Sequence, residues 1–359
     1  MICSQPLRRI IAPLGVALSA AACATEAPLQ SSFALVETGR GVEESADPGR
    51  PLIVRSGPRG QLYVATQRLS NLVQALDSSV RFIRTIGRPG PGPGEFGSVG
   101  MLYPKGDSVV VGDTRGDAAV FGPDGGFVRS LRIHIRTIGQ VLNLRGDSVL
   151  VPTPVMSKER FGLPLQLLGP DGDTVRSFGS ADRSFDGRVL SRLYRHVAPA
   201  TDSTFWVGRV DQYVVERWHM NGTLLQTLTM KRPWFPPLVK DWDGTNAERF
   251  PTMLKQVHQD HDGHLLVMLE RARPDWSASE RGGHLESGKL VSLLDRLAYE
   301  EQIIEVLDAK SGTLISTINN QGSFLLNFVD DDRVIGITQG AEGREVLVVY
   351  RVSHPTINH

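Results

Sequence analysis

A repeating pattern of four short strands constrains the fold of this 359-residue chain more than any other feature. The pattern is clearest at 86–132, where runs rich in Val, Phe and Leu occupy 100–102, 108–112, 118–121 and 127–131. Clusters of Gly, Asp and Pro separate these runs, and apolar residues alternate with polar ones, as is typical of antiparallel strands. Because one such sheet cannot cover its own apolar faces, we expect neighbouring units of the same kind.

Two kinds of turn recur along the chain and give the number of units. The earlier turn precedes a β-branched run six times, starting at Arg59, Gly106, Gly146, Thr201, Asp262 and Asp331. The later turn occurs five times, starting at Leu76, Gly122, Gly169, His219 and Ala309. The sixth unit therefore lacks a fourth strand, and the isolated strand at 33–38 can supply it by pairing with 345–352. This pairing would close a ring of six sheets and remove the free sheet edges.

The second unit resembles the NHL-type repeat of six-bladed β-propellers, because GRPGPGPGEFG is followed there by GDSVVVGDTRGDAAVFGPDGGFVRSL. More broadly, residues 33–353 resemble the six-bladed propeller lipoproteins of bacteria. The resemblance implies an all-β fold of six four-stranded blades, closed by pairing of the N-terminal strand with the last blade. It implies little about function, since propellers host binding, scaffolding and several unrelated chemistries.

The N-terminal segment is predicted to direct export and attachment. Residues 1–22 combine two arginines with an apolar run too short to be a convincing membrane span, which indicates a signal peptide. The alanines before Cys23 resemble a bacterial lipobox, which implies that Cys23 is lipidated and that 23–32 is a tether. Ala24 after it resembles sorting to the periplasmic face of the outer membrane. The alternative is an ordinary secretory signal. Since Cys3 leaves with the signal, we expect no disulfide in the mature chain.

The ring is expected to span 33–353, with a C-terminal tail at 354–359. The fifth unit carries an insertion at 271–301. Five apolar residues in this insertion have the spacing i, i+3, i+4, i+7, i+8: Leu290, Leu293, Leu294, Leu297 and Ala298. This spacing predicts one short amphipathic helix over the ring.

The charge balance argues against several classes of partner. The 39 basic and 39 acidic residues give a formal net charge of zero, so no global field attracts nucleic acid or acidic membranes. We expect no nucleic-acid partner, membrane contact only through the lipid anchor, and a monomer.

Two motif matches have simpler structural explanations. The segment 92–97 fits the G-x-G-x-x-G pattern of dinucleotide sites, but its proline removes an N–H donor and no helix follows, so we interpret it as an inter-blade loop. The three consecutive aspartates at 330–332 lack the spacing of Ca²⁺ ligands, and we interpret them as a solvated turn.

The densest histidine cluster contains His258, His261 and His264, with Asp260 and Asp262 among them. A zinc site requires ligands that converge on one point. The turn at 260–263 instead predicts that His261 and His264 diverge at a hairpin. We therefore expect no metal and no cofactor, with a metal site as the alternative.

His258 and His196 both fall on predicted innermost strands, where side chains can face the central channel. Two imidazoles near the axis could act as acid/base or metal groups, as in propeller lyases and lactonases. Glu216 and Asp113 are further channel candidates. The alternative is that both histidines are hydrogen-bonded channel or core residues.

Arginines gather in the loops that a propeller places on one face of the disc, namely those joining second to third strands and those joining blades. Guanidinium and indole groups are favoured at interfaces and at anionic ligands. The candidate binding residues are Arg115, Arg209, Arg232, Trp234, Arg271 and Trp276. The alternative is that loops are simply polar, since acidic residues share them.

Two function classes follow. The preferred hypothesis is a non-enzymatic, membrane-tethered propeller that binds a protein partner or an anionic ligand on this loop face. The alternative is a propeller hydrolase or lyase that uses a metal or histidines in the channel.

Overall fold

A computed structural model describes most of the propeller sequence. The described residues are 33–41, 50–67, 72–113, 116–133, 140–144, 147–153, 162–179, 194–200, 203–235, 252–274, 293–320, 322–330 and 332–354. All of them belong to the compact unit Ser31–His359. The predicted signal peptide, the lipidation of Cys23 and the tether lie outside the described residues.

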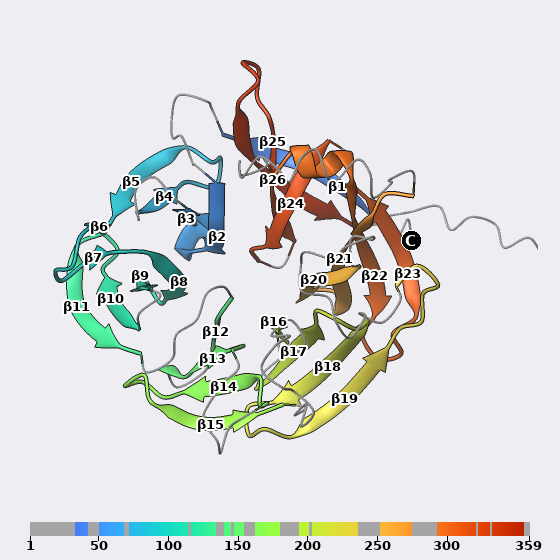
Figure 1. Cartoon of the computed structure of the whole chain (residues 1–359), viewed down its shortest axis with the longest axis horizontal. Helices are drawn as coiled ribbons and strands as arrows, with labels where there is room; N and C mark the ends of the chain where they lie inside the picture. The colour runs from blue at the N-terminus through green and yellow to red at the C-terminus, as the bar shows by residue number, and fades with distance from the viewer. Residues whose placement is uncertain are drawn as a thin grey trace, which may run out of the picture. The chain divides into compact units, whose positions relative to one another are not determined.

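The described strands form six four-stranded antiparallel sheets arranged as blades around an axis (Figure 1). Blade 1 comprises β2 (Arg50–Ser56), β3 (Leu62–Gln67), β4 (Val73–Leu76) and β5 (Phe82–Ile86). Blade 2 comprises β8 (Val99–Lys105), β9 (Ser108–Asp113), β10 (Asp117–Phe121) and β11 (Phe127–Arg132). Blade 3 comprises β12 (Leu142–Asn143), β13 (Val149–Val151), β14 (Leu165–Leu168) and β15 (Thr174–Phe178). Blade 4 comprises β16 (Arg195–Pro199), β17 (Thr204–Arg209), β18 (Val214–His219) and β19 (Leu224–Thr229). Blade 5 comprises β20 (Met253–Gln259), β21 (His264–Ala272), β22 (Glu300–Asp308) and β23 (Leu314–Asn319). The prediction of an all-β, six-bladed propeller is confirmed.

The two ends of the described chain close the ring. Blade 6 contains β24 (Ser323–Phe328), β25 (Arg333–Gln339) and β26 (Glu345–Ser353), and its fourth strand is β1 (Ala34–Arg40). The register runs from Ala34 opposite Ser353 to Arg40 opposite Val348. The sequence-based pairing of 33–38 with 345–352 is thus confirmed, and the third strand of the last blade has no open edge.

Apolar packing occurs between blades. The buried apolar residues form six clusters, each joining one pair of neighbouring blades. In β21, Leu265 and Val267 belong to the cluster with blade 4, whereas Leu266 and Met268 belong to the cluster with blade 6. Successive side chains of a strand point to opposite faces, so each inner strand contributes to two interfaces. Each fully buried side chain of this size contributes about 1.5–3 kcal/mol.

The later turns need a residue in the left-handed region, and glycine supplies it in four blades. Gly172 has φ +84°, and a Cβ there would lie 2.3 Å from the carbonyl oxygen of Arg132 in the preceding blade. No residue with a Cβ fits so close to the neighbouring backbone. The glycine that the turn requires therefore also allows the two blades to pack closely there.

The segment 92–97 lies between β5 and β8, as an inter-blade loop should. The Gly92 N–H donates to Glu95 Oε2 over 2.8 Å, and Arg88 Nε donates to Glu95 Oε1 over 2.7 Å. Two short strands pair in parallel here: β6 (Arg88–Pro89) precedes the segment, and β7 (Glu95–Phe96) lies within it.

The insertion in blade 5 is shorter than the predicted 271–301. Arg271 pairs with Glu301 and Ala272 with Glu300 in the β21–β22 ladder, so the strands continue two residues further at each end. The described part forms a four-residue 3₁₀ helix, η4 (Asp295–Ala298), rather than an α-helix. Leu293 of the predicted apolar stripe is 3% exposed against blades 1 and 6. Among the residues the structure describes, no helix is long and apolar enough to cross a membrane.

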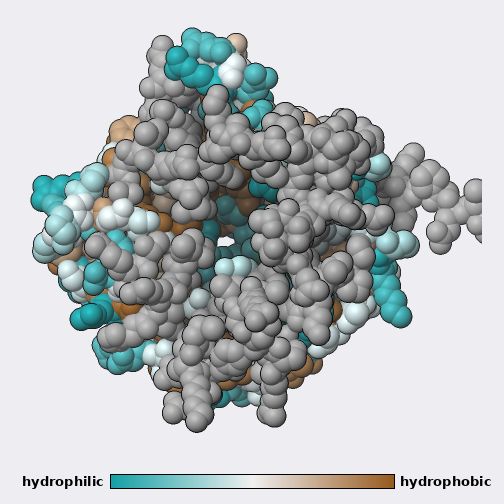
Figure 2. Space-filling model, viewed as in Figure 1, coloured by the Kyte–Doolittle hydropathy of each residue, from teal (hydrophilic) through white to brown (hydrophobic). Residues whose placement is uncertain are grey.

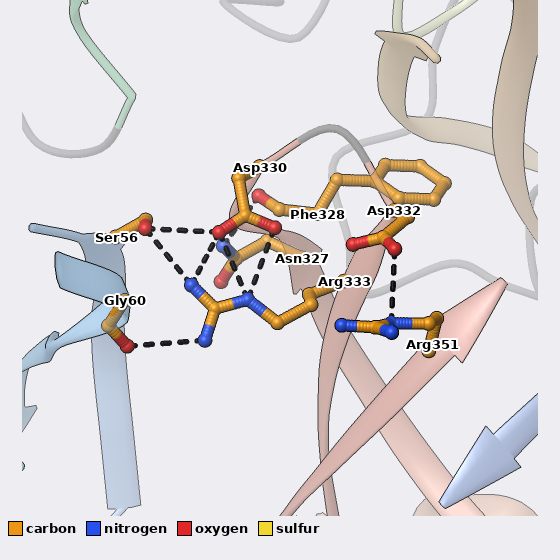
Figure 3. A network of polar contacts seen from close by, with 8 residues as sticks. All are labelled: Ser56, Gly60, Asn327, Phe328, Asp330, Asp332, Arg333 and Arg351. Atoms are coloured by element: carbon orange, nitrogen blue, oxygen red, sulfur yellow. Dashed lines mark hydrogen bonds and ion pairs between the residues drawn. The ribbon is translucent and has the colours of Figure 1, made fainter. Parts of the chain in front are cut away.

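A polar network joins blade 6 to blade 1 near the predicted aspartate turn (Figure 3). Arg333 forms an ion pair with Asp330 and donates to the Gly60 carbonyl oxygen and to Ser56 Oγ, both over 3.1 Å. Asp332 forms an ion pair with Arg351 over 2.9 Å. These two acids are therefore engaged by arginines, and Asp331 lies outside the described residues.

Candidate functional site

The link from blade 4 to blade 5 folds against the loop between β17 and β18. The Met230 N–H donates to the Tyr213 carbonyl oxygen over 3.0 Å. The Phe235 N–H donates to the Arg232 carbonyl oxygen over 3.0 Å, which forms a turn. The Tyr213 and Phe235 rings stack with centroids 5.3 Å apart and planes inclined by 24°. Both rings are buried, so this aromatic pair fixes the position of the link.

Arg232 is held in this link by a buried carboxylate of blade 5. Its Nε and Nη2 each lie 2.8 Å from an oxygen of Glu305, which gives a two-pronged pair. The Tyr213 hydroxyl also donates to Glu305, over 2.5 Å. Burial, followed by the charge of Glu305, raises the pKa of Tyr213 well above its usual value, so the hydroxyl stays protonated. The hydrogen bond to Glu305 raises the pKa of Arg232.

Arg271 and Trp234 form a second contact on the same side of blade 5. The Arg271 guanidinium lies 4.6 Å from the Trp234 ring centroid and forms an ion pair with Glu301. The Trp234 carbonyl oxygen accepts a hydrogen bond from Thr252 Oγ1 over 3.2 Å. The alternation along β21 and β22 places Arg271 and Glu301 on the face toward blade 4, where Glu305 also lies.

A cavity of about 690 Å³ opens beside these groups. Its lining is largely apolar and aromatic and includes Tyr213, Val214, Met230 and Phe235. Its polar lining residues include Lys231, which is exposed, and Arg232. We call this cavity the link pocket; Arg232 lines it, whereas Trp234 and Arg271 are not among its lining residues. Pockets of this kind, apolar with a few polar groups, are typical ligand sites.

The structure separates the six candidate binding residues. Arg232 lines the link pocket, and Arg271 contacts Trp234 on the same side of blade 5. Arg209 instead binds Glu216 over 2.7 Å, on the face of blade 4 that packs toward blade 3, where Trp218 donates to the same carboxylate. Arg115 and Trp276 lie outside the described residues.

The channel histidines face different neighbours. His196 lies on β16, the innermost strand of blade 4; burial, followed by the positive charges of Lys255 and Arg55, lowers its pKa to about 3. It is therefore neutral at physiological pH. His258 lies on β20 and is 6% exposed, and its ring stacks on Phe328 of blade 6 with centroids 5.3 Å apart. Figure 2 shows a narrow opening at the centre of the ring of blades.

A buried charge cluster that the sequence did not reveal lies between blades 5 and 6. Glu270 is fully buried, with Lys255 Nζ at 3.1 Å and Arg296 Nη2 at 3.2 Å. Arg296 also binds Glu300 and lies 4.7 Å from the Phe324 ring centroid. Burial, followed by the charge of Glu270, raises the pKa of Glu300 to about 8. The arrangement anchors η4 to the blades. No motif in the sequence connects Glu270 with Glu300, which lie 30 positions apart.

No known protein family matches this sequence, and no curated protein matches it. Solved structures match over most of its length. A candidate exported protein of Bacteroides fragilis matches with a TM-score of 0.63 at 11% identity, over 89% of this chain and 95% of that chain. Virginiamycin B lyase of Staphylococcus aureus matches with a TM-score of 0.45 at 11% identity, over 88% and 99%. The WD40 β-propeller domain of Doa1 matches with a TM-score of 0.42 at 11% identity, over 81% and 74%. The first likeness shows the fold alone, and the other two scores add nothing to it.

Proposed function

We propose that this protein is a non-enzymatic binding propeller that holds an extended segment of a partner protein at the link pocket. The observation that carries this proposal is the apolar cavity of about 690 Å³ between the Tyr213–Phe235 stack and the exposed end of the blade link. Such a cavity can take one aromatic or aliphatic side chain.

The charges around the pocket favour a peptide over a small anion. Arg232 is already paired with Glu305 and Arg271 with Glu301. A free anion would have to displace these carboxylates, one of which is buried. Lys231 is exposed at the pocket, and a carboxylate next to the anchoring side chain of the partner could meet it there.

We place the protein in the bacterial cell envelope, anchored through Cys23 on the periplasmic face of the outer membrane. The basic n-region, the apolar run and the alanines before Cys23 support this location. Cys23→Ser should move the protein from the membrane fraction to the soluble fraction. An unchanged distribution would contradict the lipid anchor.

The binding proposal is tested by introducing negative charges at the rim of the link pocket. Lys231→Glu with Pro233→Glu changes two exposed rim residues, and Lys310→Glu changes an exposed lysine in the later turn of blade 5. In affinity capture from detergent-solubilised envelope, we expect the double variant to lose a partner that the wild type and Lys310→Glu retain. Identical captured proteins in all three samples would overturn the proposal.

The alternative of a channel enzyme rests on His196 and His258, which both lie on innermost strands of their blades. Because burial lowers the pKa of His196 to about 3, this imidazole would act as a hydrogen-bonding or metal-binding group and not as the proton acceptor. If this alternative is correct, His196→Ala abolishes turnover of a lactone or aryl ester, whereas Lys231→Glu leaves it unchanged.

A further inference from the structure

Histidines and aspartates from two distant parts of the chain meet at the β20–β21 hairpin. The hairpin turn runs from Asp260 to His264, which are linked by a backbone hydrogen bond of 3.0 Å. His354 follows directly after β26 of the neighbouring blade 6. The Phe33 ring, just before β1, lies against the His264 and His354 rings with centroids 5.4 and 5.3 Å away. Closure of the ring by β1 and β26 therefore brings His354 to this hairpin.

Two triads of potential metal ligands share His354. In the first, ligand atoms of Asp260, His264 and His354 all lie within 4.8 Å of one another. In the second, the same holds for His261, Asp262 and His354. His261 and His264 thus belong to different triads, as their predicted divergence implies, but each faces the same third histidine.

The distances between the potential ligand atoms are close to those expected in a metal site. His264 Nδ1 lies 2.9 Å and His354 Nδ1 lies 3.9 Å from Asp260 Oδ2. His354 Nδ1 lies 3.0 Å from Asp262 Oδ2. Ligands around a tetrahedral zinc ion, at about 2.1 Å from the metal, are roughly 3.4 Å apart. Adjustments of about 0.5 Å would bring these donors to that spacing.

The burial of the donors also suits a metal. The Asp260 side chain is fully buried, and those of His354 and His264 are 19% and 27% exposed. Within the described part of the chain, the buried Nε2 of His354 makes no hydrogen bond, and its Nδ1 is paired only with the carboxylates of Asp260 and Asp262. Buried polar atoms normally have partners, so an imidazole in this state needs an explanation. An ion coordinated by His354 would supply one.

We propose that Asp260, His264 and His354 bind a divalent transition-metal ion, with zinc as the best fit, and that Asp262 or His261 completes the coordination. Imidazole and carboxylate ligands in this number suit zinc. To bind the ion through Nδ1, the neutral His264 ring carries its proton on Nε2 instead of donating it to Asp260 Oδ2, and the carboxylates of Asp260 and Asp262 balance the charge of the dication. The ion ties the end of β26 to blade 5, on the face of the ring opposite the link pocket. The proposal does not depend on the binding function.

The test is a metal titration of the full chain, purified with a removable tag that is then cleaved and treated with a chelator. We expect one Zn²⁺ per chain by calorimetry and elemental analysis, together with a higher melting temperature in its presence. Co²⁺ should give the visible absorption of a four-coordinate site. A stoichiometry well below one, or no change in melting temperature, would overturn the proposal.

Matched variants locate the site. His354→Gln and His264→Gln should each weaken Zn²⁺ binding at least tenfold and remove the thermal shift. His219→Gln, at the end of a hairpin strand in blade 4, should retain both. Because His354 follows the last strand, His354→Gln is expected to fold, and its melting temperature in chelator checks this. Equal zinc affinity in His354→Gln and wild type would show that the ion binds elsewhere.

Discussion

The two faces of the β21–β22 strand pair in blade 5 both carry glutamates, but they balance the charge differently. Toward blade 4, each carboxylate has its own cation: Arg232 binds Glu305, and Arg271 binds Glu301. On the face toward blade 6, both Glu270 and Glu300 pair with Arg296, and Glu270 also pairs with Lys255.

This difference determines what each arginine does. A buried pair depends strongly on both partners, because the loss of one leaves an uncompensated charge. Where two acids share a cation, one of them can take up a proton instead, and the raised pKa of Glu300 shows this response. The blade 4 side should therefore be sensitive to the loss of its arginine, and the blade 6 side sensitive to pH.

The largest effect is expected for Arg232→Met. The change keeps much of the side-chain length. It leaves the carboxylate of Glu305, which is 2% exposed, with the hydrogen bond from the Tyr213 hydroxyl but without a positively charged partner in the described part of the chain. We expect the free energy of unfolding to fall by about 3 kcal/mol, at the lower end for a broken buried pair because Arg232 is partly exposed. Urea denaturation at pH 7 measures this, and a loss below about 1 kcal/mol would show that the pair is effectively solvated.

Arg296→Met should cost less, about 1–2 kcal/mol at pH 7. Glu270 keeps Lys255 at 3.1 Å, and Glu300, with a pKa of about 8, is already largely protonated. The remaining cost comes from the lost contact with the Phe324 ring. The same urea experiment checks the ranking. If Arg296→Met proves more damaging than Arg232→Met, the two faces do not differ as described.

Glu300→Gln should change how stability depends on pH. The pKa of Glu300 is raised from 4.5 to about 8 in the folded state, so the protein gains stability from the bound proton below about pH 4.5 and loses it as pH rises through 8. The neutral amide avoids this loss. Between these two pKa values stability falls by about 1.4 kcal/mol per pH unit, so we expect the advantage of the variant over the wild type to grow by about 2 kcal/mol or more between pH 6 and pH 9. Parallel stability curves from pH 6 to 9 would contradict the raised pKa.

Much of the fold could be predicted because its signals are local. The turns at Gly106 and Gly146 recur ahead of β-branched runs, and counting turns of this kind gave six blades. The missing fourth strand then required β1 to pair with β26. The insertion was harder, since Leu293 and its neighbours pack on blades 1 and 6 through a 3₁₀ helix rather than an α-helix.

The candidate site was less predictable because its partners are distant in sequence. Arg232 has the composition of an interface residue, but its carboxylate partner lies 73 positions away at Glu305. Glu270 and Arg296 meet only because η4 returns to blade 5. His354 reaches His264 only once the ring closes, so no spacing in the sequence connects them. That these arginines contact a partner protein stays a prediction.

Site-specific photocrosslinking tests the proposed binding surface most directly. A photoreactive amino acid in place of Pro233, at the pocket rim, is compared with one in place of Lys310 at the later turn of blade 5, in intact envelopes. The account predicts a discrete adduct with one envelope protein from position 233 that position 310 does not give. The same adducts from both positions, or none from position 233, would contradict binding at the link pocket.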